Sequence, residues 1–428
     1  MNKKIISKKS LLAIIAISTL STTNVIADNN STKTAANSNI SSTGGLMLGS
    51  KTDPYWFQLS GAIKFDQMAF MGNAVSKGTE FHSGANFRGL EIDFGGGLGK
   101  DISYTLMTIY EPKDKKIKLD DAYLTYAMAE NFTVSAGQVL PGFSLESTAS
   151  GKWIPFFERS IATHALGTNL GLGVNVSKWS KDYTFIVAAM QPKQDTEAKD
   201  YNGASVTNRD DRWQTSARMV YRPIYEGTKI LQLGASGYFY DDHSSSPRFK
   251  TFAEATDRNH TDLIDTGYTN MTASNHKAID VEIAGQNGPL YGEVEYERVF
   301  VTRPAGASKL HFHGYHVLAS YVLTGEAKAF KEYNGTFGQV KPFCPKGAWE
   351  IAARYSMLNL NDKNIHGGRG NNTSLALNYY VNNNVRISGE YIRSILHPST
   401  ETLPAPTVLA NTLKRKLNIF GIRLQAVF

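Results

Sequence analysis

The C-terminus of the chain has the pattern of a β-strand. Residues 415–428, RKLNIFGIRLQAVF, alternate apolar and polar side chains up to the last residue, Phe428. Successive side chains of a strand point to opposite faces, so Phe420 and Ile422 share a face with Phe428, whereas Arg423 lies on the other. Chain ends are usually frayed unless something ties them down. This ending therefore predicts that the last strand pairs with another strand.

The same period of two recurs along the chain from residue 55. In AIDVEIAG, for example, Val281 and Ile283 alternate with Asp280 and Glu282. About sixteen such segments occur, each near the ~9–11 residues with which a tilted strand crosses a bilayer. The predicted strands are 55–70, 84–96, 100–111, 117–128, 131–140, 169–180, 182–191, 212–224, 228–241, 275–286, 289–302, 311–324, 346–360, 371–382, 384–396 and 413–428.

The connections between these strands alternate in length. Short connections are predicted at 97–99, 129–130, 181, 225–227, 287–288 and 383, and long ones at 71–83, 141–168, 192–211, 242–274, 361–370 and 397–412. Short turns at one end and long loops at the other are typical of bacterial outer-membrane barrels. The segment 325–345 breaks the alternation, because it is long where a short turn is expected.

The first 27 residues are predicted to be a cleaved signal peptide. Lysines precede the apolar run LLAIIAISTL, and Val25 and Ala27 occupy the small-residue positions before a cleavage site. The run is shorter than the ~20 residues of a membrane-spanning helix. Residues 28–54, rich in Asn, Ser, Thr and Gly, predict a flexible lead-in, which leaves 55–428 for the barrel. A buried N-terminal helix is the alternative for the leader.

Charge and cysteine content narrow the class of protein. The formal net charge is +7, but four lysines lie in the leader, so a nucleic-acid partner is not indicated. A single cysteine, Cys344, excludes an internal disulfide. The 21 Tyr, 21 Phe and 37 Gly suit an exported β protein.

These patterns predict an all-β fold, namely a transmembrane antiparallel β-barrel of about sixteen strands. Lipid offers the backbone no hydrogen-bond partner, so a spanning sheet without helices must close on itself. A barrel of this size leaves an aqueous channel. A soluble β-sandwich shares the period, but the chain is long for one sandwich, and charges in mid-strand suit a water-filled lumen.

Several motifs resemble one family. The segment AGQVLPGFSLESTASGKWIPFFERS (136–160) is similar to the strand and third external loop of the phosphate-selective porin O and P family, and KLDDAYLTY (118–126) to the strand before that loop. The motifs that follow in the family's order are YVLTGE (321–326), GQVKP (338–342), GAWEIAARYSMLNL (347–360) and LALNYYVNNNVRISGEYI (375–392). The resemblance covers roughly residues 55–428.

The resemblance implies a homotrimeric porin in the outer membrane of a Gram-negative bacterium, with its third external loop folded into the lumen. It implies passive diffusion of small hydrophilic solutes, with Arg and Lys in the pore guiding small anions such as phosphate or polyphosphate. A long connection at 325–345 is also typical of the family. The resemblance implies neither a cofactor nor an enzymatic activity.

Fixed cations in a narrow passage select anions, and the planar fork of Arg matches phosphate oxygens. The alternation places five strand arginines on the polar, lumen-facing side: Arg218, Arg222, Arg354, Arg386 and Arg423. The predicted constriction loop carries Lys152, Glu158 and Arg159. The alternative for each of these residues is that it is an ordinary polar residue of the lumen wall and binds no anion.

Acidic residues keep a general, non-specific porin as an alternative. The second predicted strand, NFRGLEIDF, contains one arginine and two acids. The eleventh carries three acids on one face: Glu293, Glu295 and Glu297. These carboxylates oppose a purely cationic lumen.

An outer-membrane hydrolase and an export barrel are the remaining alternatives. No Ser–His–acid arrangement is recognisable, and strand alternation alone produces the row of acids. GGGLGK lacks the first Gly and the final Ser or Thr of a P-loop. In HFHGYH, His311 and His313 face away from His316, so the three cannot bind one metal. An export barrel needs a plug or a passenger domain, and residues 28–54 are too short for either.

The terminal strand has one further implication. Its closing position requires pairing with the first strand near 55–70, so that no edge remains. An aromatic C-terminal strand resembles the signal that the barrel-assembly machinery recognises. Phe428 is therefore predicted to serve insertion into outer-membrane lipid.

Overall fold

The computed structural model describes residues 38–40, 45–72, 81–112, 116–192, 212–243, 245–251, 254, 262, 264–268, 271–400 and 414–428. It divides the chain into two units, Met1–Asn37 and Ser38–Phe428. Only the second unit contains described residues. The predicted signal peptide lies outside them.

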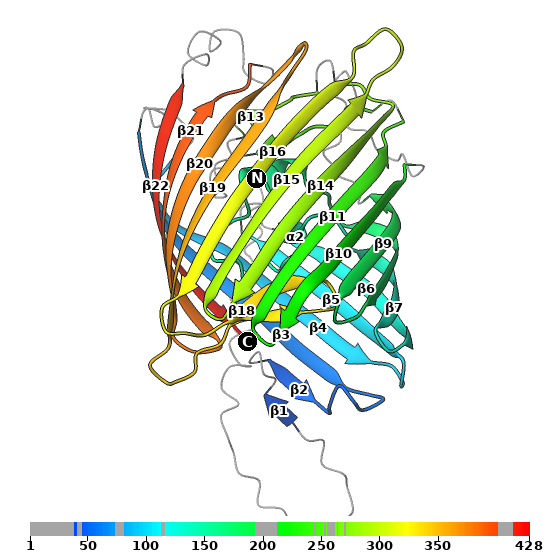
Figure 1. Ribbon diagram of the computed structural model, residues 1–428, viewed down its shortest axis with the longest axis vertical. Coiled ribbons are helices and arrows are strands. Elements are labelled where there is room, and N and C mark those ends of the chain that lie inside the picture. The colour runs from blue at the N-terminus through cyan, green and yellow to red at the C-terminus, as the bar shows by residue number, and fades with distance from the viewer. Residues whose placement is uncertain are drawn as a thin grey trace, which may run out of the picture. The chain divides into compact units, whose positions relative to one another are not determined.

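An antiparallel sheet of eighteen strands dominates the fold (Figure 1). All but two short N-terminal strands form the barrel, and they coincide with the predicted segments. They are β3 (Phe57–Met71), β4 (Gly84–Gly97), β5 (Ile102–Glu111), β6 (Lys116–Ala129), β7 (Phe132–Val139), β8 (Gly171–Trp179), β9 (Tyr183–Pro192), β10 (Gln214–Glu226), β11 (Lys229–Asp241), β14 (Asn275–Asn287), β15 (Leu290–Thr302), β16 (Leu310–Val322), β19 (Ala348–Asp362), β20 (Ile365–Tyr380), β21 (Val385–His397) and β22 (Arg415–Val427).

The barrel closes between its last and first strands. β22 pairs with β3 from Asn418 opposite Met71 to Val427 opposite Ala62. Each remaining strand pairs with its neighbour in sequence, so no strand of the barrel has a free edge. This confirms the predicted sixteen-stranded antiparallel barrel, with the terminal strand at the seam.

The two short strands lie before the barrel. β1 (Ser38–Ile40) pairs with β2 (Leu46–Leu48), which pairs in turn with Phe57–Leu59 of β3. The sheet therefore reaches into the segment for which the sequence predicted a flexible lead-in.

The outer face of the barrel is apolar and the inner face is polar. On β14, Ile279 and Val281 are 47% and 52% exposed, whereas Asp280 and Glu282 between and after them are 1% and 2% exposed. A soluble protein would bury the aliphatic side chains instead. The inverted pattern is that of a barrel surrounded by lipid. None of the described helices is long and apolar enough to cross a membrane.

The hairpin of β19 and β20 corrects one prediction. The sequence predicted a long loop at 361–370, but the two strands remain paired up to Asp362 and Ile365. A two-residue turn joins them, and Lys363 adopts a left-handed conformation with φ 52°. The polar, Gly-rich composition of this stretch resembles a loop. In a lumen-facing strand, however, polar residues do not interrupt pairing.

Two connections contain structure of their own. Between β7 and β8 lie two short helices that the sequence did not predict, α2 (Leu145–Thr148) and α3 (Ile161–Leu166). Side-chain oxygens of Ser144 and Ser160 cap them by accepting backbone hydrogen bonds. The 325–345 connection contains a hairpin of β17 (Lys328–Lys331) and β18 (Thr336–Val340).

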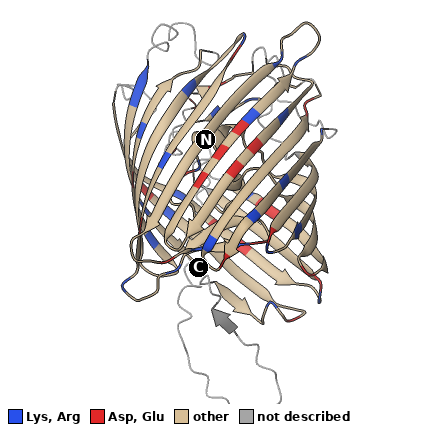
Figure 2. Cartoon of the chain, in the orientation of Figure 1, with Lys and Arg blue, Asp and Glu red and all other residues tan. Residues whose placement is uncertain are grey.

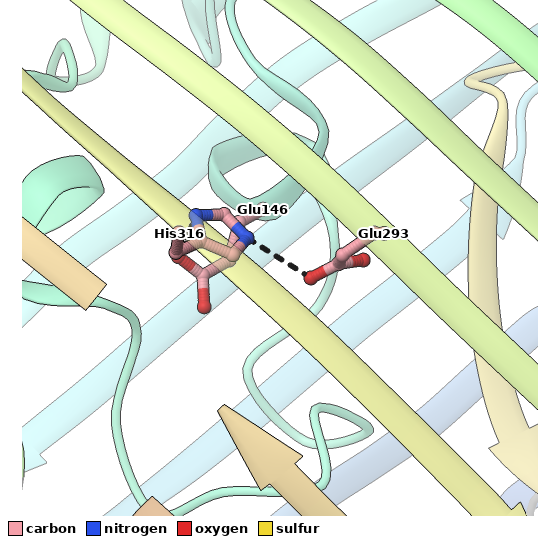
Figure 3. Close-up of side chains that lie close together, drawn as sticks. All are labelled: Glu146, Glu293 and His316. Atoms are coloured by element: carbon pink, nitrogen blue, oxygen red, sulfur yellow. Dashed lines mark hydrogen bonds and ion pairs between the residues drawn. The ribbon is translucent and has the colours of Figure 1, made fainter. Parts of the chain in front are cut away.

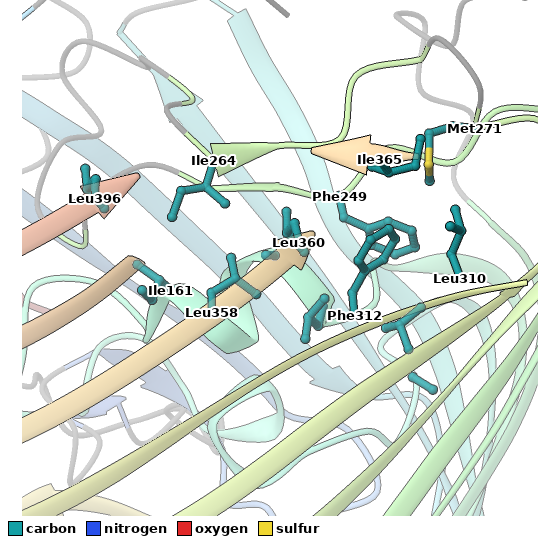
Figure 4. Close-up of a cluster of buried hydrophobic side chains, with 14 of the residues drawn as sticks. Ile161, Phe249, Ile264, Met271, Leu310, Phe312, Leu358, Leu360, Ile365 and Leu396 are labelled. Atoms are coloured by element: carbon teal, nitrogen blue, oxygen red, sulfur yellow. The ribbon is translucent and has the colours of Figure 1, made fainter. Parts of the chain in front are cut away.

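An apolar cluster packs the segment between β7 and β8 at the end of the barrel with the long connections (Figure 4). The 242–274 connection contains two short paired strands, β12 (Lys250–Thr251) and β13 (Ile264–Asp265), and contributes Phe249 and Ile264 to the cluster. The cluster joins side chains from α3, from the 242–274 connection and from the inner faces of β16 and β19, including Ile161, Phe249, Ile264, Phe312 and Leu358. Part of the lumen is therefore filled with packed protein.

Candidate functional site

The inner wall of the barrel divides into a covered and an open part. Inner-face residues from β10 to β22 are mostly buried, and they alternate with exposed outer residues. On β4 to β8 the inner positions are mostly half-buried instead. Within the described part of the chain, the inner wall is therefore less covered along β4 to β8, and inner segments cover the opposite wall. We call the solvent-accessible space beside β4 to β8 the passage.

The start of the segment 140–170 is held by a carboxylate. Both oxygens of Glu295, on the inner face of β15, accept backbone N–H groups at 2.8 Å, one from Leu145 and one from Glu146. These amides belong to the first turn of α2, where backbone donors lack helical partners. Glu295 is fully buried. Glu295, one of the three acids that the sequence analysis set against a purely cationic lumen, thus attaches this segment to the wall.

Arg354 holds the middle of the same segment. Its guanidinium donates to Glu146 at 2.9 Å and to the Glu158 carbonyl at 3.0 Å, and it contacts Glu254 at 2.6 Å. The Glu146 carboxylate also accepts the Ser160 amide at 2.9 Å. Burial opposes ionisation of Glu146, but nearby His316, Arg354 and these hydrogen bonds lower its pKa to about 2.

His316 adds a second basic group beside Glu146 (Figure 3). Its Nε2 atom lies 3.2 Å from Glu293, and its Nδ1 atom lies 3.9 Å from Glu146. As the alternation predicted, His316 lies on the other face of β16 from His311 and His313, and the structure shows that its face is the inner one, where it is fully buried.

Arg423 links the barrel seam to the tip of the segment. It forms a two-point ion pair with Asp66 at 2.6 and 2.7 Å and donates to the Phe157 carbonyl at 2.6 Å. It also contacts Glu158 at 3.2 Å, which Arg88 of β4 reaches at 2.9 Å. Although burial raises the pKa of Glu158, the charges of Arg88 and Arg423 bring it well below its usual range.

Two other predicted arginines donate mainly to carbonyl groups. Arg386 donates to the Ile154 carbonyl at 2.9 Å and to the Gln425 side chain at 3.1 Å. Arg222 lies near the short-turn end, where it donates to the carbonyls of Ser180 and Lys181. Each of these arginines thus fastens a segment of backbone.

Arg218 holds the 325–345 hairpin. Its guanidinium pairs with Glu282 at 2.6 and 2.9 Å and donates to the Asn334 carbonyl at 2.6 Å. Lys328 of the hairpin pairs with Glu350 at 2.5 Å. Since Glu282 and Glu350 lie on the inner faces of β14 and β19, the hairpin is attached to the inner wall. The connection that broke the predicted alternation is thus a second inner segment.

The loop cations are arranged differently from the strand arginines. Lys152 contacts Asp93 at 2.5 Å and Glu91 at 3.6 Å, both on β4 beside the open passage. Arg159 donates to the carbonyls of Glu146 and Ala149 within its own segment. Lys152 is therefore the predicted loop cation nearest to the passage.

A group of lysines that the sequence analysis missed lies near Lys152. Burial, together with the positive charges of Lys152 and Lys51, lowers the pKa of Lys331. Lys51 precedes β3 and Lys331 ends β17, so the two charges that act on Lys331 come from other segments of the chain. We call Lys51, Lys152 and Lys331 the lysine group. Only the unexpected length of 325–345 pointed towards Lys331 in the sequence.

These features define an outer-membrane porin. A closed barrel with an apolar exterior, a charged interior and segments attached to its inner wall is the architecture of a channel for hydrophilic solutes. The chain belongs to the phosphate-selective porin O and P family, which it matches over residues 57–428. It is thus a channel of the Gram-negative outer membrane, in agreement with the resemblance seen in the sequence.

One relative is Porin O of Pseudomonas aeruginosa. It is 27% identical over an alignment of 389 residues, and the match covers 83% of this chain and 86% of the relative. A second relative, an uncharacterised protein of Caulobacter vibrioides, is 25% identical over 325 residues, 73% of this chain and 63% of that protein.

Solved structures share the fold at low sequence identity. The outer-membrane channel DcaP of Acinetobacter baumannii has a TM-score of 0.53 at 12% identity, covering 89% of this chain and 99% of DcaP. The anion-selective porin from Comamonas acidovorans has a TM-score of 0.52 at 11% identity, covering 87% and 100%. The trimer form of OmpT from Vibrio cholerae also has a TM-score of 0.52 at 11% identity, covering 88% and 100%.

Proposed function

We propose that this porin conducts small anions, including phosphate, along the passage beside β4 to β8. The observation that carries the proposal is the lysine group. Burial is the main cause of the lowered pKa of Lys331, and the positive charges of Lys152 and Lys51 add to it. Like charges approach each other at a cost, which an anion between them offsets. The family name and the anion-selective relative support the same solute class.

The strand arginines have a positioning role in this proposal. Their guanidinium groups donate to acids and carbonyls of the protein, so they determine where the inner segments lie. Direct contact with the solute is assigned to the lysine group. Lys152 is partly neutralised by Asp93 and Glu91. Partial neutralisation keeps anion binding weak, and a conducting site must release its ion.

The test is the reversal potential of single channels in a KCl gradient. We expect the wild type to prefer chloride over potassium. In Lys331→Gln, the reversal potential should shift towards the value of a cation-preferring channel. Lys363→Gln removes an exposed lysine of the β19–β20 turn and should leave the potential unchanged. Cation preference in the wild type would overturn the proposal.

Phosphate added to the chloride solution distinguishes a specific channel from a general one. Block of the chloride current at micromolar phosphate, reduced in Lys331→Gln, supports a phosphate-preferring passage. If phosphate does not block the current but the channel still prefers anions, the protein is a general porin. In that case the acids of β4 partly neutralise the lysines.

The remaining assignments concern biogenesis and assembly. The first 27 residues direct export, Phe428 is recognised by the assembly machinery, and three copies form a homotrimer, as in the trimer form of OmpT. The protein acts as a channel without hydrolytic activity, which its family membership supports. Cross-linking in membranes followed by electrophoresis tests the trimer; a protein that remains monomeric contradicts it.

A further inference from the structure

Acidic residues are concentrated on β14 and β15 (Figure 2), and burial places the side chains of five of them on the inner face. Asp280 lies directly opposite Glu297 in the strand pairing, and Glu282 lies directly opposite Glu295. All four are at most 2% exposed. Like charges in directly opposed positions destabilise a sheet, and buried charges require partners. The arrangement therefore calls for a compensating positive charge.

The described basic side chains compensate only part of it. With Glu293, the two strands bury five inner carboxyl groups. The basic groups within salt-bridge distance of them are Arg218 and His316, among the residues that the structure describes. If all five carboxyl groups are ionised and both basic groups are charged, the five carboxyl groups exceed their basic partners by three charges.

Three of these carboxyl groups converge. Asp280, Glu282 and Glu295 each offer an oxygen, and these oxygens lie within 4.8 Å of one another. Oxygens that share one Ca²⁺ at ~2.4 Å are separated by at most ~4.8 Å. A donor set made only of carboxylate oxygens suits hard cations such as Ca²⁺ or Mg²⁺.

An unpaired oxygen supplies an independent indication. Asp280 is 1% exposed, and its Oδ1 atom has no hydrogen-bond partner among the described residues. Its other oxygen accepts a hydrogen bond from Ser236 at 3.0 Å. A buried carboxylate oxygen without a donor is costly, and a cation would satisfy it.

We propose that Asp280, Glu282 and Glu295 bind a hard divalent cation in the covered wall of the barrel. Glu295 holds the amides of α2, and Glu282 holds Arg218, which donates to the 325–345 hairpin. The cation thus fixes the two carboxylates to which both inner segments are attached. Glu146, Glu293 and His316 form a neighbouring cluster of possible ligands, but this cluster already contains a basic group, His316, and therefore has less need of a cation.

The alternative source of positive charge is protons on the carboxyl groups.

The test is a titration with each cation. The protein is refolded without lipopolysaccharide, because lipopolysaccharide itself carries divalent cations. It is then stripped with EDTA and titrated with Ca²⁺ and, separately, with Mg²⁺. We expect one bound equivalent per chain and a melting temperature at least 5 °C higher for the better of the two cations, since a ligand of the folded state stabilises it.

Asp280→Asn should lose this binding and the associated rise in melting temperature. The control Glu226→Gln, which changes an exposed acid at the end of β10, should retain both. No stoichiometric binding by wild type, or binding that Asp280→Asn retains, would overturn the site. If Asp280→Asn is more stable than the wild type in EDTA, and the wild type binds neither cation, then protons rather than a metal ion neutralise the buried carboxyl groups. If Asp280→Asn does not refold, the wild type is compared with Glu297→Gln, which leaves the three proposed ligands in place. Binding of the cation by both proteins then supports the site, and absence of binding from both contradicts it.

Discussion

Gly61 and Phe428 join the two ends of the barrel. The Gly61 amide donates to the Phe428 carbonyl at 2.7 Å, and the Phe428 amide donates back to the Gly61 carbonyl at 3.0 Å. The Phe428 ring covers Gly61 so closely that a Cβ atom there would lie 2.7 Å from the ring's Cζ atom. The last residue is therefore a full member of the closing strand pair.

Gly61→Ala should destabilise the seam. Its added methyl would meet both the ring of Phe428 and the Glu91 carbonyl at 2.4 Å. Overpacking of this kind costs about 1–3 kcal/mol. The matched control is Gly389→Ala on β21, where a Cβ meets no atom within 4 Å. Thermal unfolding followed by heat-dependent gel mobility should show a loss for Gly61→Ala alone. Equal melting of the two variants would contradict the steric account.

Deletion of Phe428 should impair insertion more than conductance. The deletion removes two backbone hydrogen bonds at the seam, whereas the inner segments are attached elsewhere. The amount of folded protein in outer membranes should therefore fall, while the molecules that do insert retain wild-type single-channel conductance. Normal insertion of the truncated chain would contradict the role assigned to the terminal aromatic residue.

Arg423→Gln should destabilise the protein and loosen the segment 140–170. It leaves Asp66 buried without its two-point partner and frees the Phe157 carbonyl. Loss of one member of a buried ion pair costs about 3–5 kcal/mol. Current noise in single channels should rise. The double variant Arg423→Gln/Asp66→Asn should recover part of the stability; if it is no better than the single variant, the ion pair is not the cause.

Glu146 should make the attachment of this segment sensitive to acid. Its pKa falls from 4.5 to about 2 on folding. A lowered pKa gives stability that is complete above pH 4.5 and is lost as the pH falls through 2. Glu146→Gln should therefore melt below wild type at pH 6, and the difference should shrink between pH 4.5 and 2. A difference that is constant over this range would contradict the linkage.

The barrel could be predicted from the sequence because strand alternation is local. Period two assigns residues such as Asp280 and Arg423 to the inner face without knowledge of their neighbours. The prediction failed where composition obscured the strands, as around Lys363, where polar residues continue the strands into a tight turn, and in the polar lead-in that contains β1 and β2. The length of 325–345 marked an irregularity, but its hairpin could not be foreseen.

The contacts inside the barrel depended on tertiary structure. Arg218 and Glu282 are 64 residues apart, and Arg423 and Asp66 are 357 apart. No local pattern reports such pairings, because they follow from closure of the sheet and from the path of the inner segments. The sequence by itself determined a lipid-facing barrel that ends at Phe428. Tertiary structure decided that its inward arginines hold protein segments, and that Lys51, Lys152 and Lys331 come together near the passage.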